Sequence, residues 1–128
     1  MQVEIDLFSG QPNPFWELTE AEVAEFKARL NALPASAPMA MPELLGYRGL
    51  NLGTLPGLNS RREPLSPDLI LSAQMGGGAI KVTLANGTTL YRKDPGRSIE
   101  CWLLTLAQGR VDESTRKIAL ANLGMPCP

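Results

Sequence analysis

The chain contains no histidine, and this absence excludes more functions than any motif in the sequence suggests. Without an imidazole there is no Ser-His-Asp triad, no Cys-His pair and no histidine-ligated metal site. Acid–base chemistry would depend on aspartate and glutamate, such as Glu4 and Asp6, which share one face of a predicted strand. We therefore expect no metal site, no cofactor and no cysteine nucleophile.

The chain also lacks an excess of charge of either sign and any long apolar run. Twelve Lys and Arg residues against thirteen Asp and Glu residues leave a formal net charge of −1. Proteins that bind nucleic acid or anionic membranes carry a basic excess, so neither partner is expected. The apolar runs, such as residues 102–104, are too short for a transmembrane helix.

Cysteine is scarce, with one residue in a predicted helix (Cys101) and one in the C-terminal tail (Cys127). A disulfide between them would close a loop of about 27 residues and contribute about 3–4 kcal/mol in an oxidising compartment. The alternative is a buried thiol at Cys101 and an exposed one at Cys127. The acidic N-terminus lacks the features of a signal peptide, so we expect the cytoplasm, or the periplasm or secretion if a signal peptide was removed.

A length of 128 residues is typical of one globular domain, which we predict to span residues 1–128. Within it, residues 34–67 hold six prolines and four glycines and are predicted to be irregular. The one strand expected there covers residues 44–52. Because it carries two glycines, it is expected at a sheet edge or with a bulge.

Local patterns predict the regular elements on either side of this segment. Alternating apolar residues predict a strand near residues 2–7, and Thr19 with Glu22 forms a capping box that begins a helix over 20–33. Two helices near the C-terminus begin after Asp94 and Asp112. The remaining strands are predicted over 68–73, 79–85 and 88–92.

These elements follow one another in the order β-α-β-β-β-β-α-α. They predict an α+β fold with a mainly antiparallel sheet of about four to five strands and three helices. The last two strands form a hairpin, because Asn86-Gly87 favours a two-residue type I′ turn. This turn would place Lys81 directly opposite Arg92.

The loop from Ser9 to Trp16 is the first candidate binding segment. It presents the hydroxyl of Ser9, the amide of Asn13 and the adjacent aromatics Phe15 and Trp16 within a proline-framed turn. Such a rigid loop suits recognition, since little side-chain entropy is lost on contact. The alternative is that the two aromatics close the end of the core.

Basic residues on the strands form the second candidate. Lys81 and Arg92 would repel each other across the hairpin unless an anion lay between them, and Arg48 and Arg97 could join them. This pattern predicts an anion or carboxylate site. The alternative is a solvated face whose basic residues pair with Asp or Glu.

Together these features favour a small soluble module without catalytic activity that binds a protein or a small anionic or carboxylate-bearing ligand. Its predicted site comprises Ser9, Asn13, Trp16, Arg48, Lys81, Arg92 and Arg97. One alternative is a compact enzyme that uses Asp or Glu with stabilisation by Arg. Another is a structural or assembly subunit with an exposed apolar patch near residues 50–58. The sequence does not determine the oligomeric state or the ligand.

Overall fold

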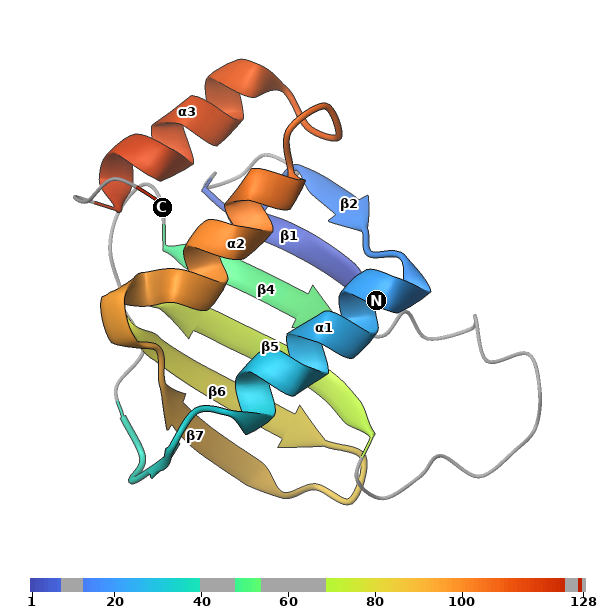
Figure 1. Cartoon of the computed structure of the whole chain (residues 1–128), viewed down its shortest axis with the longest axis vertical. Helices are drawn as coiled ribbons and strands as arrows, with labels where there is room; N and C mark the ends of the chain where they lie inside the picture. The colour runs from blue at the N-terminus through green and yellow to red at the C-terminus, as the bar shows by residue number, and fades with distance from the viewer. Residues whose placement is uncertain (8–12, 40–47, 54–68, 124–126, 128) are drawn as a thin grey trace.

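Seven antiparallel strands form one sheet in the order β2-β1-β4-β5-β6-β7-β3 in the computed structural model (Figure 1). The structure describes residues 1–7, 13–39, 48–53, 69–123 and 127. The strands are β1 Gln2–Asp6, β2 Phe15–Glu17, β3 Ala35–Ser36, β4 Gly49–Gly53, β5 Ile70–Gly76, β6 Ala79–Leu84 and β7 Thr89–Lys93. The helices are α1 Glu20–Asn31, α2 Ser98–Leu106 and α3 Glu113–Asn122, with a short 3₁₀ turn, η1, at Pro95–Arg97.

The predicted α+β class with three helices is confirmed, but the predicted four to five strands are too few. The two missed strands are β2, with three residues, and β3, with two, which are too short to show an alternating pattern. Both lie close to prolines, which made these positions resemble loops. The observed order is therefore β-β-α-β-β-β-β-β-α-α.

The strand predicted over 44–52 is also placed differently from what its glycines suggested. Its described part, β4, lies in the middle of the sheet between β1 and β5. Gly49 permits this position because a Cβ there would stand 1.9 Å from the carbonyl oxygen of Met75. Residues 40–47 and 54–68 lie outside the described residues, and so does most of the predicted irregular segment.

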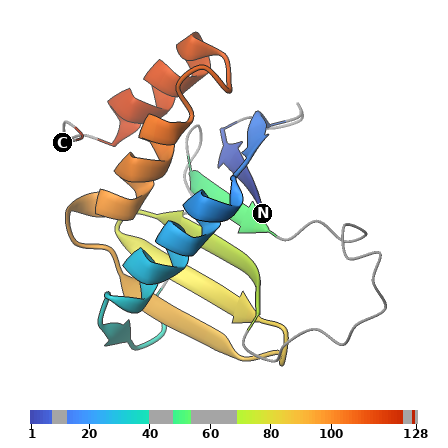
Figure 2. The same cartoon turned by 45° about the vertical axis from the view of Figure 1, so that its right-hand side comes forward.

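The core lies between one face of the sheet and the helices α1 and α2, which cross that face together (Figure 1; Figure 2). Four neighbouring strands, β1, β4, β5 and β6, supply the buried side chains of the sheet. These are Val3, Ile5, Leu50, Leu52, Ile70, Ala73, Met75, Ile80 and Val82. Phe26 and Leu30 of α1 pack on them, as do Ile99, Leu103 and Leu104 of α2. Arg29 of α1 lies 4.6 Å above the ring of Trp102, so a cation–π contact also joins the two helices.

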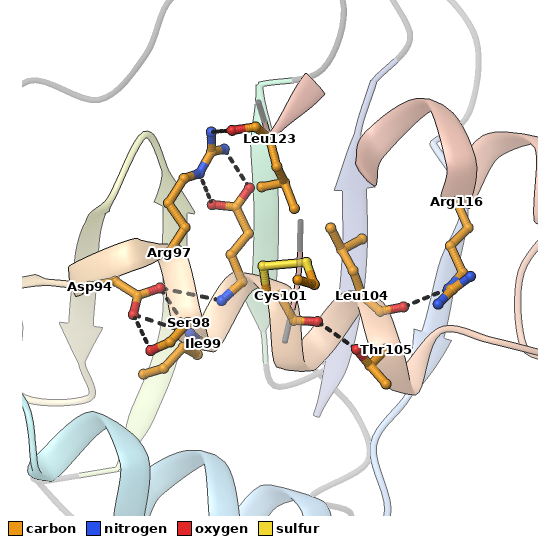
Figure 3. The surroundings of a disulfide bond; sticks show 11 residues. Asp94, Arg97, Ser98, Ile99, Cys101, Leu104, Thr105, Arg116 and Leu123 are labelled. Atoms are coloured by element: carbon orange, nitrogen blue, oxygen red, sulfur yellow. Dashed lines mark hydrogen bonds and ion pairs between the residues drawn. A yellow bond between two sulfur atoms is a disulfide. The ribbon is translucent and has the colours of Figure 1, made fainter. Parts of the chain in front are cut away.

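The predicted capping box at the start of α1 is confirmed. Thr19 Oγ1 accepts from the backbone N–H of Glu22, and the carboxylate of Glu22 accepts from the backbone N–H of Thr19. At α2, the predicted cap is displaced: the helix begins at Ser98 with Arg97 at its N-cap position, and Pro95 belongs to η1. Asp94 still contacts the start of α2 from one turn earlier. Its carboxylate accepts from the backbone N–H groups of Ile99 and Glu100 across η1 (Figure 3).

The hairpin register is one residue away from the predicted one. The turn has three residues, because Leu84 N–H donates to the carbonyl of Thr88 at 2.9 Å and Gly87 adopts φ +85°. This is a type I turn with a glycine bulge. Ile80 therefore pairs with Arg92, and Lys81 pairs with Tyr91.

A slip of one residue turns every side chain of a strand to the other face. Arg92 and Leu90 consequently lie on the helix side of the sheet, whereas Lys81 and Tyr91 lie on the opposite side. The prediction that Lys81 and Arg92 face each other is wrong.

A disulfide joins Cys101 of α2 to Cys127, whose Cα atoms are 5.4 Å apart (Figure 3). Beside it, the buried carboxylate of Glu100 accepts from Arg97 at 3.0 and 2.7 Å, and Arg97 also donates to the carbonyl of Leu123 at 3.4 Å. These contacts hold the C-terminal end of α3 against the start of α2. None of the helices in the described part of the chain is long and apolar enough to cross a membrane.

Candidate functional site

A hollow of about 420 Å³ lies between the second half of α1 and the strands β5, β6 and β7. We call it the α1–β7 hollow. Its lining consists of Lys27, Leu30, Asn31, Leu69, Ile70, Val82, Leu84, Leu90 and Arg92. Its volume falls within the range of about 300–1,000 Å³ that small-molecule sites occupy.

The floor of this hollow is apolar. Leu30, Ile70 and Val82 are buried members of the core, and Leu90 on β7 remains 37% exposed. An exposed leucine on the helix side of a sheet shows that α1 does not cover this end of β7. A ligand with an apolar group could therefore cover surface that is now in contact with water.

The rim of the hollow is basic. Arg92 Nη1 donates a hydrogen bond of 2.6 Å to the carbonyl of Leu33, which fixes the guanidinium at the edge of the hollow. Lys27 of α1 also lines the hollow. Within the described part of the chain, neither cation has a carboxylate within 4.0 Å, and the lining contains no Asp or Glu.

Two positive charges in one lining, with no Asp or Glu among the lining residues that the structure describes, create a local positive potential on a chain whose net charge is −1. The guanidinium keeps N–H groups beyond the one that binds Leu33, and these are suited to a carboxylate. The hollow thus combines an anion-binding edge with an apolar floor. Arg92 also has a structural role, since it donates to the carbonyl of Leu33 just after α1.

The structure does not bring the seven predicted site residues together. Arg92 lines the hollow, but Lys81 lies on the other face of the sheet. Arg48 forms an ion pair with Asp6 at 3.4 Å, and Arg97 forms one with Glu100 at 2.7 Å. These two arginines match the alternative interpretation, in which basic residues pair with acidic ones.

The residues of the first loop also lie apart from the hollow. Asn13 Oδ1 accepts from Leu7 N–H at 3.2 Å, and its amide group donates to Glu4 at 3.4 Å, so Asn13 ties the loop to β1. Trp16 is only 4% exposed and belongs to the core, whereas Phe15 is 59% exposed. Ser9 lies outside the described residues.

Sequence reasoning missed Lys27 and Asn31. They stand four residues apart on α1, on either side of the buried Leu30, and could have been recognised as flanking residues of the apolar stripe. Their position beside Arg92 could not have been predicted, because only the observed hairpin register turns Arg92 toward α1.

Away from the hollow, the ion pair between Arg110 and Glu22 connects separate elements of the fold. Arg110 donates to the carboxylate of Glu22 at 2.8 and 3.0 Å, which joins the α2–α3 connection to the start of α1. The hydrogen bond from Arg110 is the main cause that lowers the pKa of Glu22 below its ordinary value of 4.5. Within the described residues, no cluster of three or more acidic, cysteine or histidine side chains could hold a metal ion.

Comparison of the chain with known protein families, with curated proteins and with solved structures finds no match in any of the three.

Proposed function

We propose that this protein is a binding module without catalytic activity, and that it holds a small carboxylate-bearing ligand with an apolar group in the α1–β7 hollow. The observation that carries this proposal is the pair Lys27 and Arg92 above an apolar floor whose described lining has no acidic residue. A carboxylate is the anion that a guanidinium binds in a planar, bidentate manner.

The expected orientation follows from the lining. The carboxylate lies toward Arg92 and Lys27, with the amide of Asn31 as a further donor. The apolar group lies over Leu84 and Leu90, whose burial supplies most of the affinity. The modest volume of the hollow favours a small carboxylate-bearing ligand over a peptide or a nucleotide.

The two alternatives have less support. An enzyme based on carboxylate chemistry would place Asp or Glu in a hollow, but neither described hollow has one in its lining. An assembly subunit was expected to expose apolar residues near 50–58. Leu50 and Leu52 are instead buried in the core, and residues 54–58 lie outside the described residues.

The disulfide supports an oxidising compartment as the place where this module acts. Disulfides persist in the periplasm and outside the cell and are rare in the cytosol. The bond between Cys101 and Cys127 therefore favours the alternative of a periplasmic or secreted protein over a cytoplasmic one.

Matched pairs of probes can test the proposal by calorimetry and by amide chemical shifts. Hexanoate and phenylacetate are titrated beside their uncharged amides, hexanamide and phenylacetamide. We expect the acids to bind more tightly than the amides and to shift signals of Leu84 and Leu90. Arg92→Gln and Lys27→Gln should each weaken the acid by about tenfold, the effect of losing one charge-assisted hydrogen bond.

The control is Lys117→Gln, which removes one positive charge from the exposed face of α3. It should leave the affinity unchanged. The proposal is overturned if acids and amides bind equally, if the variants bind as the wild type does, or if no probe shifts these residues at millimolar concentrations.

A further inference from the structure

One row of side chains crosses all seven strands on the face of the sheet opposite the core. The strand registers pair Phe15 with Glu4, Glu4 with Asn51, Asn51 with Gln74, Gln74 with Lys81, Lys81 with Tyr91, and Tyr91 with Ser36. Directly paired residues of antiparallel strands lie on the same face. We call these seven residues the polar row. None of them belongs to the α1–β7 hollow.

The described helices leave this face uncovered, since α1 and α2 both cross the other face (Figure 1; Figure 2). Phe15 and Gln74 are exposed, and the other five residues are half-buried. At one end of the row, Glu4 accepts hydrogen bonds from Asn13 and Asn51 at 3.4 and 3.2 Å. These contacts fix the carboxylate in place.

Farther along the row, three polar side chains can bind a ligand without breaking a contact within the described residues. In the part of the chain that the structure describes, no hydrogen bond is formed by the side chains of Gln74, Lys81 or Tyr91, and Lys81 has no ion pair. A hollow of about 240 Å³ is lined by Asn51, Gln74 and Lys81 of the row. The smaller side chains of Ser72 and Thr83 belong to the same lining.

The chemistry of the row selects among ligands. It carries one carboxylate and one ammonium group and is therefore neutral as a whole. A nucleic acid strand needs several cations along its phosphates, and here Glu4 would repel them. An apolar protein partner or a lipid surface needs a cluster of apolar side chains, whereas the middle of this row consists of amides and charged groups.

A neutral polyhydroxylated chain satisfies all of these features. Each hydroxyl both donates and accepts, which matches the amides of Asn51 and Gln74, the free donor of Lys81 and the hydroxyls of Ser72 and Thr83. The aromatic ring of Phe15 at one end of the row and that of Tyr91, next to Ser36 at the other end, can pack against the C–H faces of pyranose rings. The strands place one side chain about every 4.8 Å, so Phe15 and Tyr91 are roughly 24 Å apart across five strand steps.

We propose that the polar row binds a neutral oligosaccharide that lies across the strands, with its central sugars at Asn51, Gln74 and Lys81 and its ends at Phe15 and Tyr91. This is a second site, on the opposite face of the sheet from the α1–β7 hollow. Binding at the polar row does not depend on the carboxylate ligand proposed for the hollow.

A glycan array of linear neutral oligosaccharides, followed by calorimetry on the strongest binders, tests the inference with the full oxidised chain. Affinity should rise with chain length up to the span of the row, so a hexasaccharide should bind more tightly than its disaccharide. The double variant Gln74→Ala/Lys81→Ala should weaken the hexasaccharide by at least about tenfold through the loss of two or more hydrogen bonds.

The matched control is Gln108→Ala/Lys117→Ala, which removes the same two side chains from exposed positions at the end of α2 and on α3. It should bind as the wild type does. Oligouridylate and heparin fragments serve as charged chains of similar length, and neither should bind. The inference is overturned if no neutral glycan binds, if the charged chains bind instead, or if the two double variants behave alike.

Discussion

Arg92 on β7 donates a hydrogen bond of 2.6 Å to the carbonyl oxygen of Leu33, two residues after the end of α1. This contact connects the hairpin with the helix over a distance of 59 residues in the sequence. It also holds the guanidinium at the rim of the α1–β7 hollow. The same side chain therefore serves both stability and the proposed ligand, and the two roles must be measured separately.

Substituting Arg92 should cost stability in the absence of any ligand. Arg92→Leu removes a hydrogen bond from a charged donor and leaves the carbonyl of Leu33 without this partner, so we expect a loss of about 1–3 kcal/mol. Urea unfolding measures the loss. Lys93→Leu, the same kind of change at the exposed neighbouring position, should cost less than about 0.5 kcal/mol. Equal losses in the two variants would contradict a structural role for the contact with Leu33.

The hairpin shows how far the sequence could predict the fold and the site. The turn at Asn86-Gly87 was located correctly, but the same dipeptide fits both a two-residue type I′ turn and a three-residue turn with a glycine bulge. The choice determines which side chains of β7 turn toward the helices, and the residues of the turn do not decide it. In the observed register Arg92 reaches the carbonyl of Leu33, which is 59 residues away in the sequence. A one-residue difference then moves Arg92 from the open face to the hollow.

The elements predicted with a clear local cause are the ones that the structure retains. The capping box at Thr19 depends on neighbours within a few residues, so it can be recognised in one sequence. The start of α2 at Ser98 instead follows the positive-φ residues Gly96 and Arg97, which the sequence pattern around Asp94 did not indicate. Strands β2 and β3 exist only because the long strands β1 and β7 offer free edges for pairing. The polar row was equally hidden, since it consists of one residue from each of seven strands.

Reducing the disulfide should destabilise the protein substantially. Cys101 and Cys127 are 26 positions apart, and closing a loop of that size restricts the unfolded chain by about 3–4 kcal/mol. We expect the melting temperature to fall when a reductant is added. The variant Cys127→Ser should melt near the reduced wild type, and the reductant should not affect it. An unchanged melting temperature on reduction would show that the bond contributes nothing to stability.

The ion pair between Glu22 and Arg110 should give stability a defined pH dependence. The hydrogen bond from Arg110 lowers the pKa of Glu22 in the folded state below its ordinary value of 4.5. The stabilisation is therefore complete above this ordinary value and is lost as the pH falls through the lower, folded-state pKa.

Glu22→Gln tests this dependence, because glutamine can still form the capping box but cannot form the ion pair. The difference in unfolding free energy between wild type and variant should shrink as the pH falls below 4.5. The pKa of Asp112 is also lowered, mainly by its hydrogen bond with Ser114, so its titration appears in both proteins and cancels in the difference. Glu20→Gln, the same change in the first turn of α1 at an exposed position, should show a smaller dependence. A difference that stays constant across this range would contradict the assignment.

Neighbouring aromatics on β2 should respond in opposite ways to truncation. Trp16 is 4% exposed and packs in the core, so Trp16→Ala should cost about 3–5 kcal/mol by leaving a cavity. Phe15, 59% exposed, should lose less than about 1 kcal/mol when changed to alanine. Because Trp16 Nε1 forms no hydrogen bond within the described residues, Trp16→Phe should retain more than half of the stability that Trp16→Ala loses. Urea unfolding of the three variants checks this order, and a larger loss at Phe15 than at Trp16 would mean that the two side chains have exchanged faces.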